Sequence, residues 1–408
     1  MLALRIKKTI MKRFSFCLLI LISLIQSITA QDIKERHQAF LTLDSHTDTP
    51  LVLSHDSFDF GARNDYETDG SRLDLIRMDE GGLDAVFFAV FVGQGDRSAQ
   101  GHLKARERAE RIFTVIDTTI AKFPDRAALA YSVADARRNI IVGRKSIFVG
   151  IENGYPIGTD LKLAEYFYNK GARYITLCHS KNNEICDSST DQPEHDGLSD
   201  FGDLLVREMN RLGMMVDVSH ISDKAFFDVL SVSDVPVIAS HSNARALCNN
   251  PRNLTDSMLV ALKENGGVAQ VCVLSAYVKA QEPNPEKEAA RDLLRVKYNH
   301  FENLSEQQTK EASAAWREID KKYPGKLASV SDLVDHIDHI VRLIGIDHVG
   351  FGSDFDGGGD LSGCRDVSQL ENITAEMIRR GYSDQDLQKF WSGNFLRVFS
   401  EVEKRRQN

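Results

Sequence analysis

The sequence predicts an α/β fold, a (β/α)8 barrel of the TIM type with a helical insertion. Three observations lead to this prediction. Short apolar runs rich in β-branched residues recur along the chain, stretches with helical periodicity separate them, and eight such units can be counted. Eight parallel strands with helices between them close a barrel of this kind.

The predicted strands, in chain order, are AFLTLDSH at 39–46, DAVFFAVFV at 84–92, SIFVGIE at 146–152, RYITLCH at 173–179, MMVDVSH at 214–220, PVIASH at 236–241, GVAQVCV at 267–273 and HVGFGSD at 348–354. The helical stretches between them include KARERAERIFTVIDTTIAKF, FGDLLVREMNRLG and SDLVDHIDHIVRLIG. The last two end on glycine, which commonly terminates a helix.

The interval at about 275–327 is longer than the other connections. It is charged, helix-prone and poor in candidate core residues, so we interpret it as a helical insertion and not as a second domain. The length of 408 residues does not decide the number of domains, because single α/β barrels often exceed about 250 residues. We expect one domain over residues 31–408.

Residues 1–30 have the order of a secretion signal. Five basic residues precede or flank the start of an apolar run from Phe14 to Ile25, and Ala30 is a small residue suited to cleavage before Gln31. The run is short for a bilayer span, although a retained anchor stays an alternative, as does a translation start at Met11. We expect an exported protein, periplasmic or secreted, without a membrane span in the mature chain.

Composition limits the partners. Without residues 1–30, 45 Lys and Arg face 59 Asp and Glu, a net charge of −14, which argues against nucleic acid or anionic membrane as a partner. The remaining cysteines show no CxxC spacing, so we predict no cysteine ligand, and their disulfide pairing cannot be deduced from sequence.

The predicted strand ends carry imidazoles and carboxylates, where barrel enzymes place their active sites. These residues are His46, Asp48, Glu152, His179, His220, His241 and Asp354. A single histidine at a strand end is more often structural than a ligand. However, the chain has only 12 histidines, and four of them stand at predicted strand ends, which favours one shared site. Nitrogen and oxygen donors of this kind suit zinc or a similar divalent ion.

The number of candidate ligands indicates two metal ions. A catalytic zinc takes three protein ligands and a water, so the five candidates exceed one ion's needs unless a carboxylate bridges. They are His46, Asp48, Glu152, His220 and His241. Glu152 is the natural bridge. Two neighbouring ions would share a water, lower its pKa and polarise a carbonyl, as amide hydrolysis requires.

The motifs together resemble the membrane (renal) dipeptidase family, zinc enzymes of the amidohydrolase-like barrel class. The resemblance runs from about Leu43 to the C-terminal region and is strongest over residues 209–256. It is carried in the family's order by LDSHTD, GIENG, YITLCHS, MNRLGMMVDVSHISDKAFFDVLSVSDVPVIASHSNARALCNNPRNLTD and HVGFGSDFDG. Each motif alone is weak, but the ordered set is specific.

The resemblance implies a role for each site residue. His46 and Asp48 would hold one zinc ion, His220 and His241 the other, with Glu152 bridging. Asp354 would contact the bridging water or hydroxide and move its proton to the leaving amine, and His179 would stabilise the oxyanion. Arg252 would bind the C-terminal carboxylate of a small dipeptide, and Tyr277 would line the same pocket. A homodimer is common in the family, and tolerance of a D-residue at the C-terminal position stays open.

Several alternatives remain at the level of sequence. Arg252 could be a surface arginine, and Asp354, Asp356 and Asp360 could suggest a calcium loop, although Arg365 stands where that motif needs a glutamate. The substrate could also be an N-acyl amino acid or a β-lactam. The GIENGYP and LCHSKNNEICDSS segments depart from the family pattern beside Glu152 and His179, so side-chain preference is not predicted.

Overall fold

A computed structural model describes residues 29–53, 55, 58–299, 304 and 306–406. The chain divides into two units, residues 1–39 and residues 40–408. In the first unit, α2 (Ala30–Gln38) begins with a capping box between Thr29 and Asp32. The secretion signal falls almost wholly on residues outside the described ranges, so it stays a prediction, as does the single domain over 31–408. Every helix in the described part of the chain is too short or too polar to span a bilayer.

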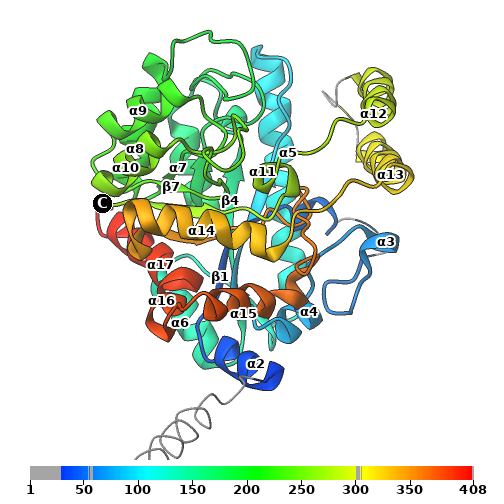
Figure 1. The fold of residues 1–408 in the computed structure, drawn as a ribbon. Coiled ribbons are helices and arrows are strands. Elements are labelled where there is room, and N and C mark those ends of the chain that lie inside the picture. Colours follow the sequence, from blue (N-terminus) through cyan, green and yellow to red (C-terminus); the bar gives the residue numbers. More distant parts are fainter. Residues whose placement is uncertain (1–28, 54, 56–57, 300–303, 305, 407–408) are drawn as a thin grey trace, which may run out of the picture. The chain divides into compact units, whose positions relative to one another are not determined.

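Residues 40–408 contain a parallel sheet whose strands follow one another in chain order (Figure 1). Along this path lie β1 (Leu43–Thr47), β2 (Ala85–Phe91), β4 (Lys145–Glu152), β5 (Ala172–Thr176), β6 (Met215–Asp217), β7 (Ile238–Ala239), β8 (Val268–Val271) and β9 (Val349–Phe351). The two ends of the path meet, because Asp48 N–H donates to Phe355 O over 2.8 Å and Asp354 N–H donates to His46 O over 3.0 Å. The predicted (β/α)8 barrel is confirmed.

One further strand, β3 (Ala127–Leu129), pairs only with β4 and lies off this path. It is not among the strands predicted from the sequence. Its three residues, one buried and two half-buried, are too few for an alternating pattern to be recognised.

The hydrogen-bonded strands also end earlier than the apolar runs suggest. His179, His220 and Asp354 lie three residues beyond the last residue of their strands, and His241 lies two residues beyond β7. His46 and Glu152, by contrast, lie within β1 and β4. These four predicted site residues therefore lie on loops at the C-terminal end of the barrel, beyond the backbone hydrogen bonds that join neighbouring strands.

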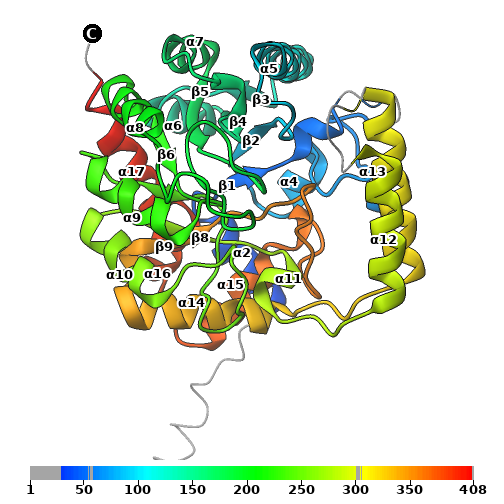
Figure 2. The same ribbon diagram turned by 90° about the horizontal axis from the view of Figure 1, so that it is seen from above.

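Helices surround the strands (Figure 2). They are α3 (Tyr66–Asp69), α4 (Leu75–Glu80), α5 (Ala99–Ile120), α6 (Val133–Ile141), α7 (Lys162–Lys170), α8 (Asp200–Leu212), α9 (Asp223–Val232), α10 (Asp256–Asn265), α14 (Val330–Ile344), α15 (Glu371–Arg379), α16 (Asp384–Gln388) and α17 (Asn394–Glu403). Short helical turns are η1 (Thr49–Leu51), η2 (Tyr155–Ile157), η4 (Ile346–His348), η5 (Val367–Gln369) and η6 (Lys389–Gly393). The main core lies between the strands and these helices.

The interval predicted as an insertion contains α11 (Ser275–Val278), α12 (Pro285–Lys297) and α13 (Glu306–Lys322). Leu294 and Tyr298 of this region pack with Ala312 and Trp316 in a small hydrophobic cluster of their own, distinct from the barrel clusters. Figure 2 shows α12 and α13 side by side at the flank of the barrel. The helical insertion is therefore confirmed.

The N-terminal end of the barrel is filled by aromatic rings. Phe87 and Phe148 stack with centroids 4.7 Å apart, and Phe395 and Phe399 of α17 meet Phe87 edge-on at 5.2 and 6.2 Å. The first residues of five strands join the same cluster, Leu43, Ala85, Met215, Ile238 and Val268. This end is closed, so a site must lie at the other end.

Candidate metal centre

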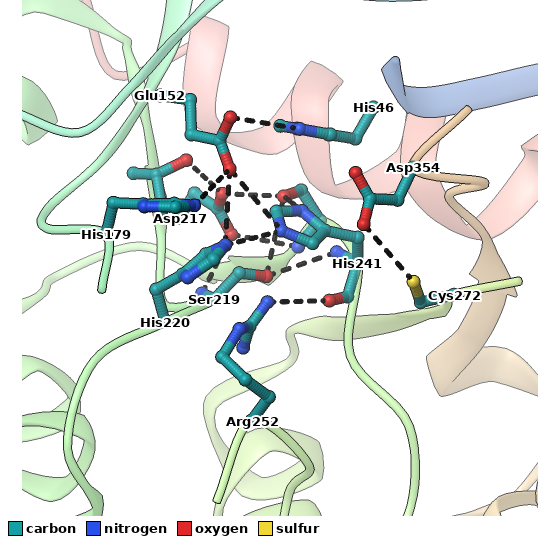
Figure 3. A network of polar contacts seen from close by, with 12 residues as sticks. His46, Glu152, His179, Asp217, Ser219, His220, His241, Arg252, Cys272 and Asp354 are labelled. Carbon is teal, nitrogen blue, oxygen red and sulfur yellow. Dashed lines mark hydrogen bonds and ion pairs between the residues drawn. The ribbon is translucent and has the colours of Figure 1, made fainter. Parts of the chain in front are cut away.

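Glu152, the last residue of β4, lies at the centre of a group of imidazoles (Figure 3). Its Oε2 is 3.5 Å from His46 Nε2. Its Oε1 is 3.2 Å from His220 Nε2, 3.7 Å from His241 Nε2 and 3.8 Å from His179 Nε2. The two oxygens of one buried carboxylate therefore face different histidines.

Three overlapping groups of side chains have the geometry to hold a cation. They are His46, Glu152 and His241; Glu152, His179 and His220; and His46, Asp48 and Asp354, with ligand atoms within 4.8 Å of one another in each group. The structure therefore brings together the seven strand-end residues singled out by sequence.

Buried nitrogen and oxygen atoms of this group lack hydrogen-bond partners among the described residues, as expected for side chains that bind a metal ion. His46 Nε2 and Asp48 Oδ1 are buried without a hydrogen-bond partner among the described residues. His220 Nε2 and His241 Nε2 lie 2.8 Å apart. Burying such polar atoms costs free energy unless a partner compensates. Nitrogen and carboxylate donors arranged in this way are suited to zinc and similar divalent ions.

The electrostatics of the site also favour a positive charge. Burial lowers the pKa of His46, but Glu152 and Asp48 outweigh it and raise the pKa to about 10. Burial similarly opposes the anion of Glu152, yet the neighbouring imidazoles hold its pKa well below the usual range. Clustered carboxylates that attract a proton this strongly also attract a metal cation, which competes for the same lone pairs.

Backbone strain is concentrated at the same loops. His220 has φ 74° and Asp354 has φ 61°, both in the left-handed region that non-glycine residues seldom adopt. A Cβ at Gly357 would overlap carboxylate oxygens of Asp48 and Asp354, so only glycine fits beside them. Strain of this kind persists where the surrounding structure holds functional groups in place.

Asp354 is buried beside His46 and Asp48. Burial and the Glu152 carboxylate raise its pKa, although His46 opposes this shift, and the result is about 7. Its Oδ2 lies 3.9 Å from Cys272 Sγ. A carboxyl with a pKa near neutrality can both accept and donate a proton.

Arg252 is buried and extends toward the histidines (Figure 3). Its Nη2 donates to His241 O over 3.2 Å, its Nε has no hydrogen-bond partner among the described residues, and its Cζ lies 5.3 Å from the Tyr277 ring centroid. Burial raises the pKa of Tyr277 to about 12, so its phenol stays neutral. The surface interpretation of Arg252 is wrong, because the loop after β7 folds its guanidinium inward.

His179 is the most exposed of the four imidazoles, with 28% of its side chain accessible. Its ring meets Phe91 edge-on at 4.8 Å, and Nδ1 lies 3.2 Å from Ser180 Oγ. Burial and Arg252 lower its pKa despite the nearby Glu152 carboxylate. It is therefore a neutral group at the edge of the site.

Sequence reasoning missed two residues behind the histidines. The Tyr174 hydroxyl lies 2.9 Å from His46 Nδ1, and its ring fits the barrel interior because Gly150 has no side chain there. Asp217, at the end of β6, is fully buried beneath His241. An acidic residue inside the apolar run MMVDVSH was a signal that could have identified it.

Comparisons with known proteins agree with this geometry. A family model described as membrane dipeptidase, peptidase family M19, matches residues 30–408. The chain is 35% identical to Dipeptidase tcpJ of Claviceps purpurea over 338 residues, 81% of this chain and 69% of that protein. It is 33% identical to Dipeptidase aclJ of Aspergillus oryzae over 377 residues, 88% and 79% of the two chains. The crystal structure of the probable dipeptidase PvdM from Pseudomonas aeruginosa matches with a TM-score of 0.79 at 33% identity, covering 92% of this chain and 98% of that one.

Proposed function

The chain belongs to the membrane dipeptidase family, peptidase family M19, which is a family of metallopeptidases. We propose that it hydrolyses dipeptides with two divalent ions, zinc in particular, and that Glu152 would be a ligand of both. His46 and Asp48 would hold one ion, and His220 and His241 would hold the other. The bridging role of Glu152 carries the proposal, because Oε2 faces His46 while Oε1 faces His220 and His241.

The ions, when bound, supply Lewis acidity and lower the pKa of a water that they share. The protein encloses the site and limits its contact with solvent. Six of the seven residues in the three candidate groups are buried and His179 is half-buried, so the site is shielded from bulk solvent on most sides. Charges interact more strongly in such a setting than in water.

Arg252 would position the substrate. Its guanidinium is a permanent cation and its Nε has no hydrogen-bond partner in the part of the chain that the structure describes, so it can offer donors to the C-terminal carboxylate of a dipeptide. The neutral Tyr277 ring beside it would form one wall of the same pocket. A requirement for a free carboxylate would place the bond next to the C-terminal residue of the substrate at the ions.

His179 and Asp354 would act on the scissile bond. His179 is neutral and at the edge of the site, where its Nε2–H could donate to the oxyanion that forms on the carbonyl oxygen when the carbonyl carbon is attacked. Asp354 would take the proton released by the attacking water on a carboxylate oxygen and deliver it to the leaving amine, a role that its place beside His46 and Asp48 supports.

A substrate panel tests this proposal. It comprises dipeptides with L- or D-residues at the C-terminal position, N-acyl amino acids and β-lactams, assayed with zinc and after treatment with a chelator. We expect hydrolysis of dipeptides, loss of activity with the chelator and recovery on addition of Zn²⁺. Metal analysis should give two ions per chain.

Preference for N-acyl amino acids or β-lactams over every dipeptide would overturn the substrate assignment. A fully active protein with one ion per chain would overturn the two-ion site. The D-residue arm decides the stereochemical preference, which the family membership leaves open.

A further inference from the structure

Asp217, the last residue of β6, is a buried acid that the proposed reaction does not use. Its Oδ1 accepts from the backbone N–H groups of Ser219 over 3.0 Å and of Ser240 over 2.8 Å. Its Oδ2 accepts from the hydroxyls of Thr176 over 2.5 Å and Ser240 over 2.6 Å. Four donors around one carboxylate satisfy it as an anion.

The Ser240 hydroxyl connects Asp217 to a histidine of the site. Ser240 Oγ lies 2.8 Å from His241 Nδ1. A hydroxyl has one proton, and here that proton is donated to Asp217, so Oγ can offer only a lone pair to the imidazole. Nδ1 of His241 must then carry the hydrogen, and the lone pair of Nε2 points toward Glu152 and His220.

The other histidines lack such a determinant. His220 Nδ1 is buried without a hydrogen-bond partner among the described residues. His46 Nδ1 faces the Tyr174 hydroxyl, which can donate or accept. Of the three proposed histidine ligands, His241 is the one that the described residues hold in a single tautomer, because an anion accepts the proton of its hydroxyl partner.

We infer that Asp217 is a positioning residue that acts through Ser240 to hold His241 as a preformed imidazole ligand of the metal centre. The inference rests on the proposed two-ion function. It differs from a purely structural role, in which Asp217 would only tie together the ends of β5, β6 and β7, because a structural tie would not require Ser240 to face His241.

The test compares Ser240→Ala, Asp217→Asn and the double variant with the wild-type protein. Ser240→Ala removes the relay, by which we mean the two hydrogen bonds of the Ser240 hydroxyl to Asp217 and His241. It leaves the two backbone hydrogen bonds and the Thr176 hydrogen bond to Asp217 in place. The matched control is Ser146→Ala, a buried serine on β4 whose hydroxyl donates to Ala136 O over 3.3 Å, six residues before Glu152. Chelator-treated proteins are titrated with Zn²⁺ by calorimetry.

We expect Ser240→Ala to weaken the binding of one of the two zinc ions by about 10–100-fold, the usual effect of losing a partner behind a histidine ligand. Ser146→Ala should bind both ions like the wild type. The double variant should bind zinc as tightly as the single variant with the lower zinc affinity, because Asp217 acts on His241 only through Ser240. In ¹⁵N spectra of histidine-labelled protein, His241 should be the Nδ1–H tautomer in the wild type and lose that preference in Ser240→Ala.

Wild-type zinc affinity in Ser240→Ala, or an equal loss in Ser146→Ala, would overturn the relay while leaving the two-ion proposal intact. Losses that multiply in the double variant would also overturn it. A wild-type protein that binds only one ion would overturn the proposed function and the relay together. Ser240→Ala carries the test even where Asp217→Asn does not fold.

Discussion

The two ends of the barrel are built on opposite principles. The N-terminal end is apolar and complete, with Phe87, Phe148 and the α17 phenylalanines in mutual contact. The C-terminal end is polar, and among the described residues it contains buried atoms such as Asp48 Oδ1 and His220 Nδ1 that have no hydrogen-bond partner. Packing of apolar rings therefore stabilises one end of the barrel, whereas the other end holds buried polar atoms that a bound ion could satisfy.

The largest expected effect is at the polar end. Asp354→Asn removes the group proposed to move a proton, so kcat should fall by about 10²–10⁴-fold while two zinc ions per chain are retained. Steady-state kinetics and metal analysis measure both. Asp125→Asn, an exposed change of the same kind, should leave kcat unchanged. A near-normal kcat in Asp354→Asn would contradict the assignment.

At the apolar end, Phe87→Ala should lower the free energy of unfolding by about 3–5 kcal/mol, because it opens a cavity among packed rings. Urea unfolding of the metal-loaded protein measures this change. Phe227→Ala, at a side chain that is 42% exposed, should cost far less. An equal loss of unfolding free energy in Phe87→Ala and Phe227→Ala would contradict the view that the rings at the apolar end contribute more to stability than a surface phenylalanine does.

Zinc binding should make the polar end contribute to stability. Zn²⁺ at about 100 times its dissociation constant should stabilise the folded chain by about 2.7 kcal/mol per independent site, since the ligands are brought together only in the folded state. Thermal unfolding with zinc and with a chelator measures this difference. An unchanged melting temperature would argue against metal binding at these residues.

The smallest effect is expected away from both ends. Ser329 caps α14 in a capping box with Asp332, so Ser329→Ala should cost about 1 kcal/mol. Despite opposing burial, Lys279 and the Ser329 cap lower the pKa of Asp332 to about 2. This contribution is present above the unfolded carboxyl pKa of about 3.9 and is lost as the pH falls through about 2. Urea unfolding of both proteins at pH 7 and pH 3 checks the sign: a larger cost of Ser329→Ala at pH 3 would contradict it.

Part of the site could be predicted because its signals are local. A histidine or carboxylate that follows an apolar run, as His220 follows MMVDVS, is visible in a short window of sequence. The contacts behind these residues were not predicted. Asp217 and Tyr174 looked like ordinary strand residues, and their bonds to Ser240 and His46 join positions on different strands.

The inward path of Arg252 illustrates the same limit. Its place eleven residues after His241 was compatible with a surface arginine, and the loop after β7 decides the matter by bonding Arg252 to His241 O. The left-handed backbone at His220 and Asp354 could not be predicted either, because histidine and aspartate adopt positive φ at only a small share of their positions, although more often than most residue types.

Side-chain pattern over short distances was enough to predict the alternation of strands and helices, the number of barrel strands and the residue types at their C-terminal ends. The aromatic rings with which α17 fills one end, the pairing of β3 with the sheet and the histidines that face both oxygens of Glu152 became visible only in the folded chain. Those contacts join residues remote in sequence, and closure of the barrel is what brings them together.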